Sequence, residues 1–336
     1  TILFKFLLFY LGQHHRRRRK TKSALWKKRC TALDEAALPV YTLLVPLYRE
    51  AKSLPRLLND LRALDYPRAR LDIKLIIEED DFETFLAAQA LQPESLFDII
   101  PVPYSLPRTK PKACNYALRF AKGEYVTIYD AEDRPDPLQL KKAVYAFQNN
   151  SEELLCLQAR LNYYNRRHNL LTRLFAIEYA AWFDYMLPAL EKLGIPIPLG
   201  GTSNHIALSR LKQLGEWDPY NVTEDADLGI RLALASGRTR VLDSLTLEEA
   251  PISLWAWIKQ RTRWIKGYMQ TWLVHMREPL TLYRTLGPGP FWGFQFFVGG
   301  PCLVFLLSPL FWLLTLYWLA GGTSLHAGPL PVWLIV

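Results

Sequence analysis

The stretch Tyr125-Val-Thr-Ile-Tyr-Asp130-Ala-Glu132-Asp133 is a run of aromatic and β-branched residues that ends in carboxylates. Such residues favour a buried strand. Oxygen ligands at alternating positions at the end of a strand suit a hard divalent cation that carries a diphosphate. Acids at strand ends are also common in solvated turns, and Pro135 and Pro137 favour a turn. This stretch alone therefore leaves a metal site and a turn equally open.

The sequence around this stretch has the pattern of an α/β domain between residues 39 and 250. Predicted strands at residues 40–47, 73–77, 99–102 and 125–129 alternate with predicted helices at residues 53–64, 84–91 and 112–120. Such alternation implies a mostly parallel sheet with right-handed crossovers. Ligands of such sheets bind beyond the carboxyl ends of the strands. The acidic run Glu78-Glu79-Asp80-Asp81 follows the second predicted strand, as Asp130 follows the fourth.

The positive charge of the chain is concentrated at one end. The chain has 336 residues and a net charge of +9, yet residues 1–33 contain all of that excess, with many basic side chains and no acid. A basic body would favour nucleic acid as a partner, whereas a basic run beside an apolar end favours the cytoplasmic side of a membrane. We therefore expect a lipid bilayer and no nucleic acid as partner. The 4 cysteines show no metal-ligand spacing, which favours a reducing compartment.

Apolar segments flank the α/β region. Residues 1–12 are predicted to be the end of a transmembrane helix, and residues 13–38 a basic cytosolic linker. Residues 169–194 and 253–276 carry too many charges for a span, so each is predicted to lie at a membrane surface or to pack on the domain. Residues 291–320 contain no charged residue and predict a transmembrane helix. A polar turn at 321–328 and the start of a further transmembrane helix at 329–336 follow.

A carboxylate pair precedes a predicted helix at residues 226–235. Thr223 suits a helix N-cap, and Glu224 and Asp225 would offset the helix dipole. A carboxylate at a helix start is also rigidly aimed, as a general base that removes a hydroxyl proton must be. The two interpretations are compatible.

Another candidate motif lies in the second amphipathic segment. Gln260, Arg263 and Trp264 have the spacing of one helix face. An amide, a guanidinium and an indole on one face can stack on a sugar ring and bind hydroxyls or a phosphate. Trp and Arg are also expected on a helix at a membrane interface, so the motif alone favours that simpler explanation.

The order of these motifs resembles that of the membrane-embedded family 2 glycosyltransferases, in the cellulose-synthase-like group. The series runs from the strand-end acids through Asp130-Ala-Glu132, Gly200-Gly201-Thr202, Thr223-Glu224-Asp225 and Gln260…Arg263-Trp264 to an apolar span. The resemblance covers residues 40–319. It implies a mostly parallel α/β domain of GT-A type at residues 39–250, an amphipathic interface helix at residues 251–280, and attached transmembrane helices. The implied localisation is the plasma (inner) membrane, multi-pass, with the catalytic domain in the cytoplasm.

The resemblance also implies roles for individual residues. The catalytic residues would be Asp225, as general base, and Glu224; the donor-binding residues Glu78, Glu79, Lys112, Asn115 and Asp130; the acceptor-binding residues Gly201, Thr202, Gln260, Arg263 and Trp264; and the ligands of Mg²⁺ or Mn²⁺ Asp130 and Glu132. Within the first acidic run Glu79 is favoured. The family has aspartate where Glu132 stands, so Asp133 is a second candidate for that ligand.

The implied reaction is a direct, inverting displacement in which a nucleotide-sugar, usually a UDP-sugar, extends a growing β-linked polysaccharide that the protein helps to export. Two alternatives stay open. One is a non-processive transferase that glycosylates a lipid carrier, and the other is an inactive scaffold subunit that keeps the fold. The sugar, its linkage and the oligomeric state are not determined by the sequence.

Overall fold

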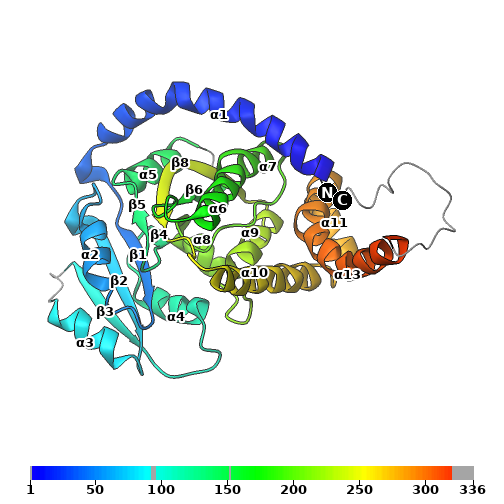
Figure 1. Cartoon of the computed structure of the whole chain (residues 1–336). Helices are drawn as coiled ribbons and strands as arrows, with labels where there is room; N and C mark the ends of the chain where they lie inside the picture. Colours follow the sequence, from blue (N-terminus) through cyan, green and yellow to red (C-terminus); the bar gives the residue numbers. More distant parts are fainter. Residues whose placement is uncertain (1, 92–95, 151–152, 320–336) are drawn as a thin grey trace.

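The structure is a computed structural model of the whole chain, and it describes residues 2–91, 96–150 and 153–319. A central sheet is covered by helices, a long N-terminal helix lies over one side, and a helical arm projects at the C-terminal end (Figure 1).

The sheet has eight strands in the order β3-β2-β1-β4-β7-β6-β8-β5. The strands are β1 (Tyr41–Leu47), β2 (Leu71–Glu78), β3 (Phe97–Val102), β4 (Tyr125–Ile128), β5 (Arg134–Pro135), β6 (Leu154–Tyr163), β7 (Asn204–Ala207) and β8 (Arg238–Glu248). β7 pairs antiparallel with β4 and β6, and β5 pairs antiparallel with β8. The other pairings are parallel. The predicted mostly parallel sheet is confirmed, and β1 to β4 are the four predicted strands.

Both faces of the sheet are buried, as expected of parallel strands. Successive side chains of a strand point to opposite faces. In β1, Leu44 accordingly belongs to one hydrophobic cluster, whereas Leu43 and Val45 belong to another. Six strands run in the same direction, namely β1, β2, β3, β4, β6 and β8. Their carboxyl ends consequently meet at one edge of the sheet, which is where sheets of this kind bind ligands.

Helices cover the two faces. α2 (Leu54–Arg62) buries four leucines at i, i+3, i+4 and i+7, which is the spacing of one helix face. α3 (Phe82–Ala90) and α4 (Lys110–Ala117), the latter extended by a 3-10 turn to Phe120, confirm the other two predicted helices. α5 (Gln139–Gln148), α8 (Leu208–Gln213) and α9 (Glu224–Leu234) complete the covering layers.

The first helix crosses the predicted limit between an apolar end and a basic linker. α1 runs without a break from Ile2 to Thr31. Its apolar start packs on the protein itself: the Phe9 ring stacks on Tyr185 with centroids 4.4 Å apart. A Cβ at Gly12 would lie 2.2 Å from the carbonyl oxygen of Tyr185, so only glycine permits this approach. The assignment of residues 1–12 and 13–38 to a span and a linker stays a prediction.

Residues 169–194 form two helices joined by a π-helical turn. α6 (Leu170–Ala181) begins with a capping box in which Asn169 and Thr172 bond reciprocally. The π turn at Trp182–Met186 leads into α7 (Leu187–Leu193), which ends at Gly194 with a φ of 65°. One face of α6 packs on the domain, and the opposite face leaves three aliphatic side chains exposed (Leu170, Leu174 and Ile177).

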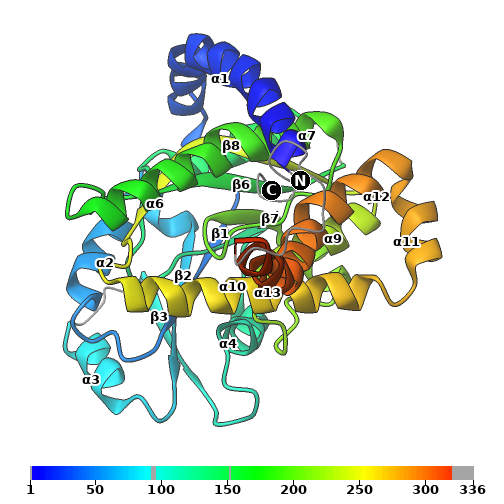
Figure 2. The same cartoon turned by 45° about the vertical axis from the view of Figure 1, so that its right-hand side comes forward.

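The second amphipathic segment is a single helix, α10 (Leu254–His275), as predicted. It is followed by α11 (Pro279–Leu286), α12 (Pro288–Phe294), a π turn at Gln295–Gly299 and α13 (Gly300–Leu319). In Figure 2, α13 is seen nearly along its axis, while α6 and α10 lie across the view.

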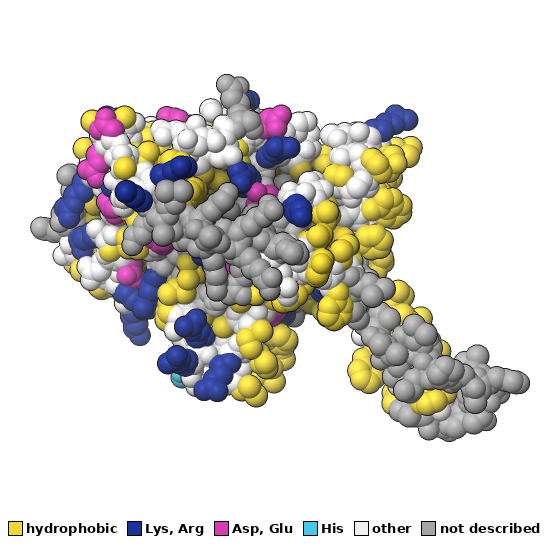
Figure 3. Space-filling view, turned by 90° about the horizontal axis from the view of Figure 1, so that it is seen from above, with side chains coloured by type: hydrophobic (Ala, Val, Ile, Leu, Met, Phe, Trp, Pro, Cys, Tyr) yellow, Lys and Arg dark blue, Asp and Glu magenta, His cyan; other side chains and the backbone are white. Residues whose placement is uncertain are grey.

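One described helix, Pro288–Trp318, is long and apolar enough to cross a membrane by length and composition. It coincides with the span predicted at residues 291–320. Hydrophobic side chains gather on the side of the molecule from which this arm projects (Figure 3). The predicted turn at 321–328 and the segment at 329–336 lie outside the described residues.

Candidate active site

Lys110 joins three parts of the chain at the carboxyl edge of the sheet. Its Nζ donates to the carboxylate of Asp130, which follows β4, and to the carbonyl oxygen of Gly201 at 2.8 Å. A Cβ placed on Gly201 would lie 3.7 Å from Asp225 Oδ2 and 3.9 Å from Lys110 Nζ. The structure thus brings together Asp130, Gly201 and Asp225, which the sequence assigned to donor, acceptor and base.

The lysine at this centre is Lys110, and Lys112, whose predicted role in donor binding stays a prediction, lies elsewhere. Lys112 instead pairs with Glu78, with Nζ 2.9 Å from Oε1 and 3.0 Å from Oε2. Side chains two positions apart on a helix point to nearly opposite sides. Lys110, at the start of α4, therefore faces the acid that follows β4, while Lys112 faces the end of β2.

Asp133 holds the loop after β4 in place through one of its two carboxylate oxygens, and its role as a second candidate ligand stays a prediction. It is buried, and its Oδ2 accepts hydrogen bonds from the backbone N–H of Asp130 at 2.8 Å and from the hydroxyl of Thr202. The Thr202 hydroxyl also lies 3.0 Å from the carbonyl oxygen of Ile128. Thr202, predicted to bind acceptor, is buried as well. These contacts tie the loop after β4 to the loop before β7, and so fix Asp130 against Gly201.

The two acids at the start of α9 lie in the first turn of that helix, two residues earlier than the predicted start at 226. Thr223 occupies the N-cap position, but its side chain makes no capping hydrogen bond to α9, all of which is described. Glu224 and Asp225 therefore lie where the helix dipole favours negative charge.

Carboxyl groups at this edge hold protons more tightly than usual. Burial raises the pKa of Asp225 to about 6, against opposing effects of the Ala226 backbone and Lys110. Burial, together with the neighbouring Asp225, raises the pKa of Glu224 to about 8. Burial and the charge of Asp130 raise the pKa of Glu132 to about 7. A base with a pKa near neutrality is suited to accept a proton from a hydroxyl.

Glu248, at the end of β8, was missed by the sequence analysis. Burial raises its pKa well above the usual range, followed by the charges of Asp133, Asp130 and Glu132. Its carboxylate therefore belongs to the same acidic edge. The sequence signal was available, because the Glu248-Glu249 pair follows an alternating run, but that run was not recognised as a strand.

The residues present fit a hard divalent cation. Within residues 2–91, 96–150 and 153–319, no three His, Cys, Asp or Glu side chains are arranged as a preformed metal cage. Mg²⁺ is usually held by one or two carboxylates together with substrate phosphates, so such a cage is not required. Asp130 and Glu132 supply two carboxylates, and burial together with the charge of Asp130 raises the Glu132 pKa, an effect that a bound cation would offset.

The acidic run after β2 divides its residues among several tasks. Glu78 is buried and pairs with Lys112, as described above. Glu79 is exposed, and its Oε2 lies 3.3 Å from the backbone nitrogen of Tyr104. Asp80 pairs with Arg108 at 2.6 Å, and Asp81 caps α3 by accepting from the backbone N–H of Thr84. Glu79 is the acid of this run that is left facing solvent without an ion pair among the described residues.

Asn115 is engaged with the protein backbone. Its side-chain nitrogen donates to the carbonyl oxygen of Trp217 at 2.7 Å, and its oxygen accepts from the Trp217 backbone N–H at 3.2 Å. This pair fastens α4 to the loop after α8. In this structure Asn115 therefore supports the loop, and its predicted role in donor binding stays a prediction.

The three acceptor-motif residues on α10 lie in different surroundings. Gln260 and Arg263 line an open cleft of about 480 Å³ together with Glu249, Ile252 and Lys259. The side-chain oxygen of Gln260 is buried without a hydrogen-bond partner among the described residues. Arg263 is exposed.

Trp264 packs inward instead. Its ring centroid lies 6.0 Å from that of Phe175 and 6.3 Å from that of Tyr179, both on α6. The guanidinium of Arg261 lies 4.7 Å from the Trp264 centroid and also pairs with Glu178. Arg261, which the motif leaves unspecified, therefore joins α6 to α10.

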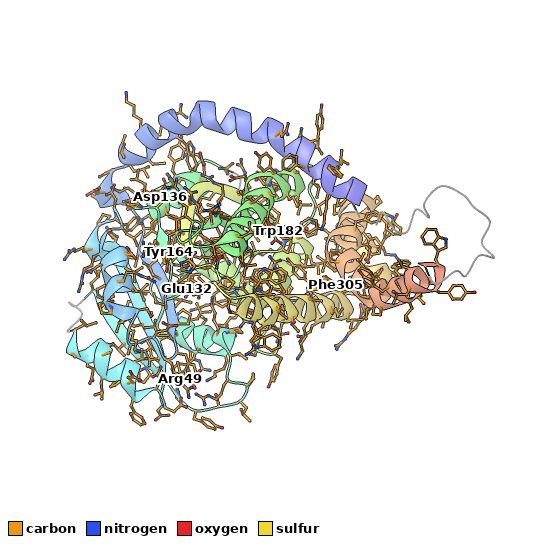
Figure 4. All side chains as sticks on the ribbon, in the orientation of Figure 1. Arg49, Glu132, Asp136, Tyr164, Trp182 and Phe305 are labelled. Atoms are coloured by element: carbon orange, nitrogen blue, oxygen red, sulfur yellow. The ribbon has the colours of Figure 1, made fainter. Side chains whose placement is uncertain are left out.

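Tyr164 links the cleft to the acidic edge. The guanidinium of Arg134, two residues beyond Glu132, lies 4.0 Å from the Tyr164 ring centroid. The Tyr164 hydroxyl donates to Glu249 at 2.6 Å. Glu132 and Tyr164 project to neighbouring positions in the view of Figure 4. Tyr164 thus connects Glu249, which lines the cleft, to the segment that follows Glu132.

The chain is similar in sequence to known proteins. A family model described as glycosyl transferase family group 2 matches residues 125–336. The probable glycosyltransferase YdaM of Bacillus subtilis is 26% identical over 251 residues, or 74% of this chain and 59% of that protein. A β-monoglucosyldiacylglycerol synthase of Trichormus variabilis is 24% identical over 271 residues, or 79% of this chain and 56% of that protein. The chain thus spans less than two thirds of the length of these curated relatives.

Solved structures show the same fold. The mannosyltransferase PcManGT from Pyrobaculum calidifontis, in complex with GDP-Man and Mn²⁺, has a TM-score of 0.64 at 21% identity, covering 99% of this chain and 88% of that one. Residues 1–349 of Staphylococcus aureus TarS in complex with UDP-GlcNAc have a TM-score of 0.50 at 16% identity, covering 76% and 72%. The predicted GT-A-like α/β fold is confirmed at this level.

Proposed function

The chain belongs to glycosyl transferase family group 2, and we propose that it is an inverting hexosyltransferase that uses a nucleotide-sugar donor at a membrane surface. The observation that carries the proposal is the convergence of Asp130, Gly201 and Asp225 around Lys110. The donor class is supported by the neighbouring structures that hold GDP-Man and UDP-GlcNAc. UDP-sugars are our first choice of donor.

In the proposed reaction, Asp225 takes the proton of an acceptor hydroxyl. The hydroxyl oxygen attacks the anomeric carbon, and the bond from that carbon to the diphosphate oxygen breaks on the opposite side. An α-linked donor therefore gives a β-linked product. A carboxylate at a rigid helix start, with a pKa raised to about 6, is suited to this role.

The leaving diphosphate would lie against Asp130 and Lys110. Asp130 and Glu132 would hold Mg²⁺ or Mn²⁺, whose chemistry is to offset negative charge on the diphosphate. Lys110 adds a positive charge at the same place. Glu78, Glu79 and Lys112 would contact the nucleoside end of the donor, where β2 ends. Glu224, the neighbouring carboxylate, would assist Asp225 in accepting the proton.

We propose a growing β-linked polysaccharide as acceptor, bound along the cleft that Gln260 and Arg263 line. Support comes from the place of Gln260 and Arg263 in the lining of the cleft and from the course of α10, which leads through α11 into the apolar helix Pro288–Trp318. Trp264 would offer an indole edge to the terminal sugar, since one side of it already packs on α6.

A lipid acceptor is the second candidate. It is favoured by the relative named β-monoglucosyldiacylglycerol synthase and by exposed apolar residues beside the cleft, Ile252, Leu254 and Trp255. The inactive scaffold is disfavoured, since the acids converge as catalysis requires.

The proposed setting is the cytoplasmic face of the plasma (inner) membrane, in a multi-pass protein. Residues 39–250 would form the catalytic domain, residues 251–280 an interface helix, and residues 291–320 a span. The exposed side chains of α6 and α10 support contact with the lipid surface. Residues 1–12 would belong to a further span, with residues 13–38 as the linker.

The test is a panel of UDP- and GDP-sugars, each incubated with Mn²⁺ and either an oligosaccharide primer or diacylglycerol vesicles. Release of nucleoside diphosphate that depends on one acceptor identifies both substrates. Linkage analysis of the product should show a β-bond. No turnover with any donor, or an α-linked product from an α-linked donor, would contradict the proposal.

A further inference from the structure

α10 and the start of α9 are joined by a run of polar contacts. Asn221 Nδ2 donates to the Thr271 hydroxyl at 3.0 Å, and Thr223 Oγ1 lies 3.5 Å from the same hydroxyl. Gln270 Nε2 donates to the carbonyl oxygen of Tyr220 at 3.0 Å. These residues, together with Asp227 and His275, are called the α9–α10 seam below.

The second half of the seam is a series of side-chain contacts that runs from His275 through Asp227 to Arg231. His275 Nε2 and Asp227 Oδ1 are 2.8 Å apart, and both side chains are nearly buried. Asp227 Oδ2 accepts from Arg231 Nε at 2.7 Å. Arg231 in turn donates to the carbonyl oxygens of Leu214 and Glu216 at 2.8 and 2.7 Å. α10 is thereby fixed to α9 and, through it, to the loop that precedes α9.

The seam replaces the support that a helix usually gives to its own start. Thr223, at the N-cap of α9, makes no capping bond within that helix, and its side chain faces α10 instead. A Cβ at Gly267 would lie 2.3 Å from Thr223 Cγ2, so the missing side chain allows the two segments to touch. The direction of the first turn of α9, which contains Asp225, is therefore set by α10.

The same helix carries the acceptor motif. Gln260 and Trp264 precede Gly267 by about two turns and one turn of α10. Movement of α10 against α9 would consequently change the separation between the acceptor cleft and the carboxylate of Asp225. The donor contacts at Lys110, Asp130 and Glu78 belong to other elements and do not depend on the seam.

We propose that the α9–α10 seam sets the distance between the bound acceptor hydroxyl and Asp225, and that Asp227 and His275 are positioning residues for the transfer reaction. The inference rests on the proposed function and adds a specific consequence to it. Breaking the seam should separate donor activation from transfer. The donor would still be bound and slowly cleaved by water, while attack by the acceptor would be lost.

The experiment compares the full chain with His275→Ala, His275→Gln and Leu273→Ala. Glutamine keeps an N–H donor near the position of Nε2 and should restore the contact. Leu273 is an exposed residue of the same helix and serves as the matched control. Nucleoside diphosphate release is measured with and without acceptor, and donor KM and melting temperature are measured for each variant.

We expect His275→Ala to lower acceptor transfer by about 10²-fold, the usual cost of misplacement by about 1 Å. The donor KM should stay within about twofold of that of the parent, because the contacts that bind the donor are not changed. The ratio of donor hydrolysis to transfer should rise, and His275→Gln and Leu273→Ala should both behave like the parent. A merely structural role would lower hydrolysis and transfer together.

Two results would overturn the inference: normal transfer by His275→Ala, or a parallel fall of hydrolysis and transfer with an unchanged ratio. If His275→Ala does not fold, Thr271→Val interrupts the other half of the seam and is judged by the same ratio. A parent chain that turns over no nucleotide-sugar would instead overturn the proposed function.

Discussion

Lys110 Nζ donates a hydrogen bond to the carbonyl oxygen of Gly201 at 2.8 Å, although the two residues are 91 positions apart in the chain. The same nitrogen bonds the carboxylate of Asp130. One side chain thus sets the distance between the end of β4 and the loop that faces Asp225. A lysine so placed can serve both the frame and the diphosphate.

Replacing Lys110 and Lys112 should give different kinetic defects. Lys110→Met removes the cation beside Asp130 and should lower kcat by about 10²-fold, the usual size of one lost electrostatic contact at a reaction centre. Lys112→Met leaves Glu78 unpaired at the end of β2 and should act mainly on the donor KM. Steady-state kinetics with a varied donor distinguishes them. Equal effects of the two changes on kcat would contradict the assignment.

Removal of the metal should abolish transfer. In the metal-free protein, the melting temperature should fall as the pH rises. Asp225, Glu132 and Glu224 have pKa values raised to about 6, 7 and 8. A folded state that binds protons more tightly than the unfolded chain loses stability as pH rises through those values. In EDTA the melting temperature should therefore be lower at about pH 8 than at about pH 6.

Mn²⁺ should raise the melting temperature more at the higher pH, where deprotonated carboxylates are available as ligands. Glu132→Gln should reduce this Mn²⁺ effect, because one proposed ligand is lost. The exposed Glu153→Gln is the matched control. Full transfer in EDTA, or a melting temperature that rises with pH in EDTA, would argue against this cation site.

Gly267 offers a test of the close packing between α10 and the N-cap of α9. In Gly267→Ala the new Cβ would lie 2.3 Å from Thr223 Cγ2, so the helices must shift. Overpacking of this kind usually costs about 1–3 kcal/mol of stability. Gly289→Ala is the matched control, because a Cβ there meets nothing within 4 Å. Denaturant unfolding of both variants measures the difference, and equal stabilities would contradict the packing described.

The sequence predicted the half of the sheet whose strands are rich in apolar residues. β1 to β4 were recognised because apolar β-forming residues dominate there, even with Lys74 in β2 and Asp98 in β3. β8, Arg-Thr-Arg-Val-Leu-Asp-Ser-Leu-Thr-Leu-Glu, alternates between buried and half-buried positions, so its charged residues concealed it. β7 has only four residues and runs antiparallel between parallel neighbours, which no local pattern reveals.

The geometry of the candidate site could be predicted from the sequence only in part. Asp130, Gly201 and Asp225 come together as expected, because strand ends and a helix start meet at one edge. Choosing between Lys110 and Lys112 required the direction in which each side chain leaves α4. Likewise, the spacing placed Trp264 and Arg263 on one helix face. In the structure the guanidinium over the Trp264 ring is that of Arg261, because α6 packs on the side of α10 where these two residues lie.

The central claim is that Asp225 is the base of a glycosyl transfer, and Asp225→Asn tests it most directly. Asparagine has the size of aspartate and is a good residue for a helix start. If Asp225 only stabilises its helix, the substitution should lower the free energy of unfolding by about 1 kcal/mol or less. The measurement is the rate of acceptor-dependent sugar transfer at saturating donor. A fall of about 10²–10⁴-fold, with donor and Mn²⁺ affinity nearly unchanged, is the predicted result for loss of a general base. Near-normal transfer by Asp225→Asn would contradict it.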